Sequence, residues 1–429
     1  MNTAPLLSAV SSSPRVRAAE RDVPPATAAA AGPGARLMSL DALRGFDMFW
    51  IIGATAISDA LLKMKPSAVT TAIATQLQHV RWEGFHFYDL IFPLFLFIVG
   101  VSTVFSLGRH TAEAEKGPAV KRILLRGFVL YLLGIFYHGG LSERWPNIQF
   151  SGVLQRIAAC YVAAALLFLF LRLRPLIVTC VALLVGYWAL LTYVPFPDLR
   201  FEASHIERLA VQVGSNSPSA IAAAVPERVR GVYEEGRNLT NYLDFRFLPG
   251  RKPIGRYYIN EGLLSTLPAI SITLCGIFAG LLLRSGSIDG RRKAAWLFGG
   301  GLIVLTLGLL WSLQFPLIKR IWSSSFCLTA TGCSAMAMAV FHLVVDVWQA
   351  RRWCQPFVWI GMNAITIYLA MNVLSFSRIA ERLVGGDVKS FLDVQVAAGL
   401  GALVVALVSL ALAVGLTCFL HRRRIFLRV

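Results

Sequence analysis

The sequence predicts an all-α polytopic membrane protein with about ten transmembrane helices, and three observations support this class. Of its 429 residues, 56% are hydrophobic and only 15% are charged, whereas about 25% of an ordinary soluble domain is charged. The mean hydropathy is +0.63, and the apolar residues gather in long runs. The net charge of +18 is typical of a membrane protein with basic cytoplasmic loops, so we do not expect nucleic acid as a partner.

Ten apolar runs approach the roughly 17–25 residues that a membrane-spanning helix needs. In chain order they cover residues 42–62, 85–107, 123–139, 153–171, 175–194, 262–283, 294–315, 326–347, 357–377 and 394–420. Residues 1–36 are rich in Ala, Pro, Ser and Arg without an apolar helical stripe, which predicts a disordered cytoplasmic tail. The transmembrane domain therefore covers residues 37–420, and residues 421–429 form a basic cytoplasmic tail.

The placement of Lys and Arg predicts the orientation of the spans. With both termini in the cytoplasm, the inner segments carry about twice as many Lys and Arg as the short outer loops, as the positive-inside rule requires. Residues 195–260, between the fifth and sixth spans, then form an extracytoplasmic insertion long enough for a small cap. The Ala- and Arg-rich composition fits a bacterial inner membrane, with the outer side facing the periplasm.

The seven cysteines are scattered and lie mostly within apolar runs. No CxxC pair and no metal-ligand spacing is present, so we expect small core residues rather than a disulfide framework or a zinc site.

Ionisable residues within the spans are costly and are therefore candidates for function. Asp41 and Arg44 lie three residues apart, on one helical face, at the inner end of the first span. They form either a local ion pair or an anion site for a phosphate-bearing cytosolic ligand, since Arg binds phosphate in a bidentate manner.

The richest polar cluster lies between His79 and Pro93, where the first outer loop enters the second span. A neutral imidazole can act as a base or nucleophile near pH 7, and a buried carboxylate such as Asp89 can orient it. The alternative is that His79 is an ordinary interfacial residue. Trp82 and His86 lie close by in sequence, and His86 is a rival for the same role.

Further polar residues lie at later spans. Arg156, beside Gln155 at the outer start of the fourth span, needs a carboxylate or an anionic ligand, with Asp89 or Glu261 as its partner. It is either part of a structural ion pair or part of a site on the outer side. Asn363 in the ninth span either bonds a neighbouring helix or contacts a ligand.

Taken in order, these clusters resemble the heparan-α-glucosaminide N-acetyltransferase family. The matching stretches are residues 36–45, 79–93 with 97–102, 152–157, 261–268, 322–326 and 361–363. The resemblance implies a membrane acetyltransferase that takes the acetyl group of cytosolic acetyl-CoA to the amine of a glucosamine on the other side. It also implies an active-site histidine in the motif matching His79-Val80-Arg81-Trp82, and a homodimer.

The resulting hypothesis divides the polar residues by role. His79 accepts the acetyl group or deprotonates the amine, and Asp89 holds its tautomer. Acetyl-CoA is the co-substrate and no metal is required. The expected acceptor-binding residues are Gln155, Arg156, Glu261, Trp82 and His86, and those expected near the CoA phosphates are Arg44, Asp41 and Asn363. Two alternatives stay open: a membrane acyltransferase with another glycan acceptor, and an amino-sugar transporter.

Overall fold

The computed structural model describes residues 37–108, 113–142 and 144–427. The predicted tail 1–36 lies outside the described residues, as do the last two residues of the tail 421–429. In the described part of the chain, eight helices are long and apolar enough to cross a membrane. This confirms the all-α polytopic class.

The eight long apolar helices coincide with eight of the ten predicted spans. They are α1 (Met38–Lys63), α3 (Phe87–Leu107), α5 (Val153–Phe170), α6 (Leu173–Tyr193), α10 (Thr266–Arg284), α11 (Gly290–Trp311), α12 (Ser324–Phe341) with its π-helical continuation (His342–Val347), and α17 (Leu400–Arg422).

The other two predicted spans differ from simple helices. The ninth is broken into α13 (Gln355–Met362) and α14 (Ala364–Leu374), which are bent by 79° at Asn363. The third corresponds to α4 (Glu113–Tyr137), whose first half carries several Lys and Arg, so that its apolar part is short. The count of ten spans therefore stays a prediction.

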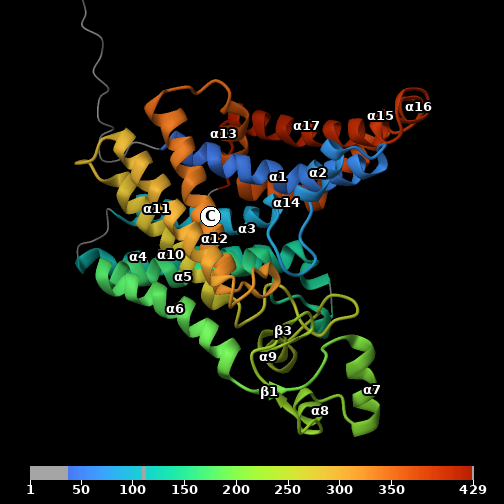
Figure 1. Cartoon of the computed structure of the whole chain (residues 1–429). Coiled ribbons are helices and arrows are strands. Elements are labelled where there is room, and N and C mark those ends of the chain that lie inside the picture. The colour runs from blue at the N-terminus through green and yellow to red at the C-terminus, as the bar shows by residue number, and fades with distance from the viewer. Residues whose placement is uncertain (1–36, 109–112, 143, 428–429) are drawn as a thin grey trace, which may run out of the picture. The chain divides into compact units, whose positions relative to one another are not determined.

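The helices of the domain pack closely in pairs. α3 packs along α10, α11 along α12, and α1 along both α13 and α17, as Figure 1 shows for α1 and α17. Glycines permit the closest approach: a Cβ added to Gly100 of α3 would lie 2.0 Å from the Thr273 carbonyl oxygen of α10. A Cβ on Gly276 would lie 2.1 Å from the Phe97 carbonyl oxygen. Small residues at such contacts are the usual means by which membrane helices approach each other.

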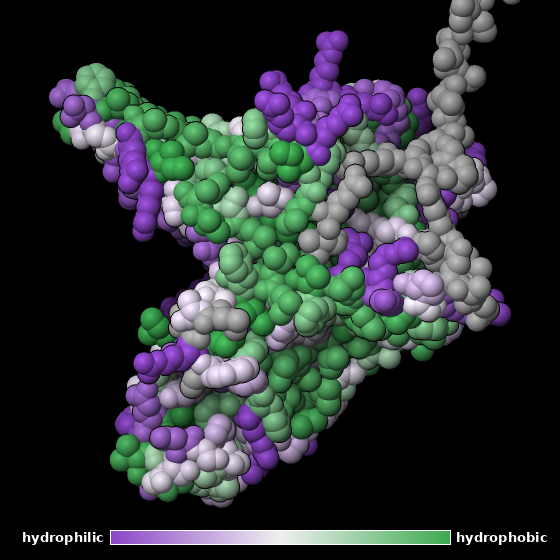
Figure 2. Space-filling model, turned by 180° about the vertical axis from the view of Figure 1, so that it is seen from behind, coloured by the Kyte–Doolittle hydropathy of each residue, from purple (hydrophilic) through white to green (hydrophobic). Residues whose placement is uncertain are grey.

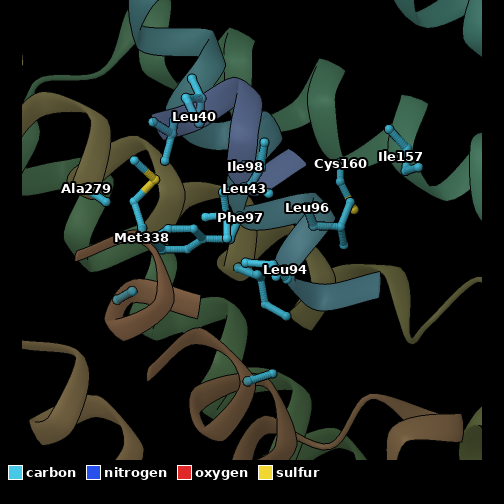
Figure 3. Close-up of a cluster of buried hydrophobic side chains, with 14 of the residues drawn as sticks. Leu40, Leu43, Leu94, Leu96, Phe97, Ile98, Ile157, Cys160, Ala279 and Met338 are labelled. Atoms are coloured by element: carbon cyan, nitrogen blue, oxygen red, sulfur yellow. The ribbon is translucent and has the colours of Figure 1, made fainter. Parts of the chain in front are cut away.

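The largest apolar cluster lies where α1, α3, α5, α10 and α12 meet. Figure 3 shows ten of its side chains: Leu40, Leu43, Leu94, Leu96, Phe97, Ile98, Ile157, Cys160, Ala279 and Met338. The cysteine is buried and unpaired among them, as expected for a small core residue.

The predicted insertion, residues 195–260, folds into a small unit that we call the cap. It contains β1 (Phe196–Pro197), α7 (Ala203–Val213), α8 (Pro218–Ala223), β2 (Arg228–Val229), β3 (Tyr233–Glu234), β4 (Arg237–Asn238) and α9 (Leu239–Phe247). β1 pairs antiparallel with β2, and β3 with β4. Buried Phe196, Phe201 and Ile206 give it an apolar core.

Short elements complete the described chain. They are α2 (Ala68–Gln76), α15 (Phe376–Val384), α16 (Asp387–Phe391), the 3-10 turns Gly140–Ser142, Trp145–Asn147 and Lys319–Ile321 (the last called η3), and a π-helical turn Leu392–Val396.

Two groups of contacts mark the two ends of the helical domain. At one end Arg44 of α1 bonds Ser102 of α3, and Arg284 of α10 donates to the Gly108 carbonyl. At the other end the chain before α3 meets η3 and the cap. In Figure 2 hydrophobic residues cover most of the middle of the visible face, and hydrophilic residues gather toward its margins. This is the distribution expected of a membrane-embedded bundle.

Candidate active site

A cavity of about 380 Å³ lies between α1, α3, α5 and α14. Most of its wall is apolar, with side chains such as Met48, Phe95 and Ile365. Its polar lining residues are His79, Tyr88, Tyr137, Asn260, Glu261, Lys319, Arg320 and Tyr368. An apolar cavity with a few convergent polar groups is the usual form of a small-molecule site.

His79 and Asp89 form a hydrogen-bonded pair at this cavity. The His79 Nδ1 atom lies 2.8 Å from Asp89 Oδ1, and the Asp89 side chain is only 1% exposed. The other Asp89 oxygen accepts hydrogen bonds from the backbone N–H groups of Val80 and His86. Because an acceptor carboxylate faces Nδ1, we assign the imidazole proton to that atom. The Nε2 lone pair is then available for chemistry.

The surroundings of His79 favour its neutral form. Burial lowers the pKa of His79 below its ordinary value of 6.5; the hydrogen bond to Asp89 opposes this, and the positive charge of Lys319 lowers the pKa further. The ring stacks on Tyr88 with 4.5 Å between the ring centroids. Half of the His79 side chain is exposed, so the ring is held yet accessible.

Lys319 is the third member of this cluster. Its Nζ lies 2.9 Å from His79 Nδ1, 3.4 Å from His79 Nε2 and 3.4 Å from Asp89 Oδ1. Burial lowers the pKa of Lys319 to about 8, although the carboxylate of Asp89 opposes this. The turn that carries it ends at Trp322, whose φ of 55° is in the left-handed region. Such backbone strain in a bulky residue is found where the surrounding structure holds a site in place.

Glu261 lines the cavity from a short segment that is hydrogen-bonded to both the cap and α5. Asp244 of the cap accepts the backbone N–H of Leu263 at 2.9 Å, and Arg156 of α5 donates to the Gly262 carbonyl at 3.0 Å. Burial raises the pKa of Asp244 to about 7.

Arg156 therefore takes a backbone carbonyl and the Ser265 hydroxyl as its hydrogen-bond partners, where the sequence suggested a carboxylate. Its guanidinium also lies over the Trp322 ring, 4.9 Å from the centroid. Trp322 lines the cavity and Arg156 does not. Gln155, which donates to the Gln149 carbonyl at 3.3 Å, is likewise absent from the lining. Arg156 supports the wall of the cavity through Trp322, and Gln155 bonds the chain before α5.

Trp82 and His86 also lie outside the lining. Trp82 Nε1 donates to the Tyr233 carbonyl of the cap at 2.8 Å, which ties the His79 segment to the cap. His86 precedes α3, and its Nδ1 faces the Gln78 carbonyl at 3.0 Å. Of the two rival histidines, only His79 faces the cavity.

Of the residues expected near the CoA phosphates, Arg44 and Asp41 lie toward the opposite end, whereas Asn363 lies beside the cavity. Arg44 donates to Ser102 at 2.6 Å and lies 3.4 Å from Asp41. Asn363, at the bend between α13 and α14, donates to the Trp359 carbonyl and is adjacent to cavity-lining Ala364. At about 1.5 Å per residue along α3, Ser102 lies about 20 Å from Asp89.

Among the described residues, no group of three His, Cys, Asp or Glu side chains has the arrangement of a metal site.

Comparison with known proteins finds similar sequences. A family model described as heparan-alpha-glucosaminide N-acetyltransferase, catalytic, matches residues 36–204. The heparan-alpha-glucosaminide N-acetyltransferase of Homo sapiens is 26% identical over 409 residues, which cover 82% of this chain and 55% of that protein. The Mus musculus protein of the same name is 26% identical over 351 residues, or 69% of this chain and 49% of that one. The chain is thus similar to the heparan-alpha-glucosaminide N-acetyltransferase family, by the family model over residues 36–204 and by relatives at 26% identity.

The chain spans about half the length of the curated family members that it matches. The matched region holds the His79–Asp89 pair, Arg44 and Arg156. Glu261 and Lys319 reach the same cavity from outside that region, so the candidate site is assembled from both halves of the chain.

Sequence reasoning missed Lys319, Arg320 and the cavity tyrosines Tyr88, Tyr137 and Tyr368. In the predicted topology Lys319 and Arg320 fall in a short outer loop, where nothing separates them from ordinary loop charges. One signal was available: they directly precede the family-like stretch 322–326. No sequence signal marked the tyrosines, because aromatic residues occur in every predicted span. Tyr137 and Tyr368 stack with 4.5 Å between their ring centroids, a contact between residues more than 200 positions apart.

Proposed function

We propose that this protein is a transmembrane N-acetyltransferase that moves the acetyl group of acetyl-CoA to the amine of a glucosamine-type sugar. One observation carries the proposal: in a chain similar to this family, a neutral His79 is held at Nδ1 by Asp89 beside an apolar cavity. An imidazole in this state is a nucleophile or base near neutral pH. Asp89 fixes the tautomer and stabilises the positive charge that develops on the ring.

The residues suited to the two substrates lie toward different ends of the domain, which supports separate entry of CoA and the sugar. CoA is polyanionic and crosses lipid only at high cost, so we place its phosphates near Arg44, Asp41 and Asn363. Met48 lies one helical turn after Arg44 on α1, Phe95 lies between Asp89 and Ser102 along α3, and both line the cavity. The flexible arm of CoA would pass along this route and bring the thioester to His79.

The chemistry has two versions, which share His79. In the first, Nε2 attacks the thioester carbon and the C–S bond breaks, releasing the CoA thiolate. The sugar amine then attacks the acetyl carbon, the bond to Nε2 breaks, and the proton lost by the amine is taken up by the thiolate. In the second, Nε2 accepts that proton while the amine attacks the thioester directly.

The acceptor would enter at the cap end. Asn260 and Glu261 line the cavity there and are suited to hold sugar hydroxyls or the ammonium before it loses its proton. Trp82, His86, Gln155 and Arg156 would act by supporting this wall. A panel of free glucosamine, muropeptide amines and hydroxyl sugars, assayed with one donor, tests the proposed acceptor class against other glycans.

We also propose a bacterial inner-membrane location with the cap toward the periplasm, on the basis of the Lys and Arg distribution. A homodimer is proposed from the family resemblance. Mass photometry of the purified protein in detergent checks the oligomeric state.

The decisive experiment measures acetyl transfer from labelled acetyl-CoA to glucosamine by purified protein. We expect His79→Ala to lower the rate by about 10²- to 10⁴-fold, because it removes the nucleophile or base. His205→Ala, in the cap, is the matched control and should keep the wild-type rate. His86→Ala tests the rival histidine and should keep most of the activity.

Full transfer by His79→Ala would contradict both versions of the mechanism. If the wild type instead moved labelled glucosamine across a membrane without acetyl-CoA, the transporter alternative would replace the enzyme.

A further inference from the structure

Lys319 approaches His79 in an unusual way. Its Nζ lies 2.9 Å from Nδ1 and 3.4 Å from Nε2. A group placed in the ring plane, in line with the Nδ1–H bond, would be much farther from Nε2 than from Nδ1, because that bond and the Nε2 lone pair point in diverging directions. The similar distances show that the amine lies against the ring and is aligned with neither the Nδ1–H bond nor the Nε2 lone pair. Nε2 stays open, and a positive charge lies beside it.

The backbone holds this placement. η3 follows an antiparallel bridge between Glu83 and Ile318, and the Gly84 N–H donates to the Leu317 carbonyl at 2.9 Å. The segment that carries Lys319 is thus tied to the segment that follows His79. On the other side of η3, the Ser323 hydroxyl accepts from the Ile318 N–H.

We propose that the Lys319 ammonium is a catalytic group that stabilises the oxyanion formed at the acetyl carbonyl. This inference rests on the proposed acetyl transfer. When the Nε2 lone pair, or the amine, bonds to the carbonyl carbon, the C=O π pair moves onto oxygen, and Lys319 donates a hydrogen bond to that oxygen. The pair returns when the C–S bond breaks and the thiolate leaves, so Lys319 keeps its proton throughout.

Other cations near the cavity are less suited to this role. Arg156 lies behind Trp322 and outside the lining. Arg320 lines the cavity, but its Nη1 donates to Glu235 of the cap at 2.6 Å. Lys319 has its nearest carboxylate, Asp89, at 3.4 Å, and Asp89 already accepts from His79. One donor of Lys319 is therefore available to a developing oxyanion.

The charged groups around Lys319 set the pH range in which it can act. Asp89 of α3 and Glu261, before α10, raise its pKa, while burial, which is the largest effect, and Arg320 lower it. With a pKa of about 8, the required ammonium is lost as pH rises through about 8. The required neutral His79 is lost as pH falls through a pKa below 6.5. The rate should therefore decline on both sides of neutral pH.

The test compares Lys319→Met, which removes the charge, with Lys319→Arg, which keeps it. We expect Lys319→Met to lower kcat by about 10²- to 10³-fold, the loss typical of one oxyanion-hole donor. Its acetyl-CoA affinity should be unchanged, and its decline above pH 8 should disappear. Lys319→Arg should recover part of kcat and move the alkaline decline upward. Exposed Lys65→Met is the matched control.

The outcomes separate this inference from the proposed function. If the wild type does not transfer acetyl groups, the proposed function fails. If the wild type is active and Lys319→Met keeps kcat within about threefold, the oxyanion role is wrong. Equal losses in both variants, with an unchanged pH profile, would also overturn it, because that pattern indicates packing alone. Thermal unfolding of each variant excludes misfolding as the cause.

Discussion

At the residue scale, single buried polar groups hold the segments that surround the cavity. Asp244 accepts a hydrogen bond from the Leu263 N–H, and Arg156 donates one to the Gly262 carbonyl. Both bonds hold the backbone directly after Glu261, which lines the cavity. Neither side chain lines the cavity. A buried polar group costs free energy unless it is hydrogen-bonded, so these contacts with the backbone give the segment one preferred position. Their loss would displace Glu261 without removing it.

Asp244 predicts a specific pH dependence of stability. Its pKa is about 7 in the fold, against a model value of 3.8, because burial disfavours the charged form. The stability that protonated Asp244 gives the fold is therefore fully present below about pH 4 and is lost as pH rises through about 7. The loss amounts to up to about 4 kcal/mol. The charged neighbours that oppose burial are Arg156 and Lys252.

Unfolding temperatures of the wild type and Asp244→Asn, measured from pH 4 to 8, check this prediction. The difference between them should change by several degrees across pH 5–7 and level off above. A difference that is constant with pH would show that Asp244 does not titrate in this range.

At the element scale, several helices pack closely at glycines, where the facing helix leaves no space for a Cβ atom. Gly100 and Gly276 pack α3 against α10. Gly45 and Gly361 do the same for α1 and α13, with distances of 1.6 and 1.9 Å from an added Cβ to the facing carbonyl oxygens. α1 and α3 both line the cavity, so these contacts also hold two of its wall helices in place.

We expect Gly276→Ala to destabilise the protein by at least about 1–3 kcal/mol, because the added methyl group meets backbone rather than a flexible side chain. Gly300→Ala in α11 is the matched control, since nothing lies within 4 Å of its added Cβ. That control should be neutral or slightly stabilising, because Ala favours the helix. Thermal unfolding in detergent measures both. Equal stability of the two variants would refute the role of close packing.

At the scale of the whole domain, the two ends differ in chemistry. The end that carries Arg44 and Arg284 also holds Asp346, which accepts the backbone N–H of Ser39 at 3.3 Å. The other end carries His79, Lys319 and the cap. A cavity that begins beside His79 and has its floor between α1 and α3 fits a reaction whose donor and acceptor arrive from opposite sides.

Sidedness can be measured with single cysteines at exposed positions of the two ends. Ser219 lies in the cap, and Ser287 lies between α10 and α11. We expect a membrane-impermeant maleimide to label Ser219→Cys from the periplasmic side of spheroplasts, and Ser287→Cys only after the membrane is opened. Labelling of both from one side would contradict the predicted orientation. The parent protein, with its own seven cysteines, is the background control.

The sequence by itself determined the class of the protein, most of its spans and the residues most suited to chemistry. Apolar run length and costly buried charges are local properties of a chain, and both are visible without a structure. His79 and Asp89 lie ten residues apart, so even their meeting was within the range of local reasoning, and the structure places them 2.8 Å apart.

Only the tertiary structure decided which polar residues reach the cavity. Arg156 and Gln155 have the right chemistry and the right depth, yet the rotation of α5 directs them behind the wall. Lys319 lies 240 positions from His79 and looked like a loop charge, but the bridge between Glu83 and Ile318 brings it against the imidazole. Helix rotation and long-range pairing depend on how all the helices pack together, and no local pattern in a single sequence carries that information.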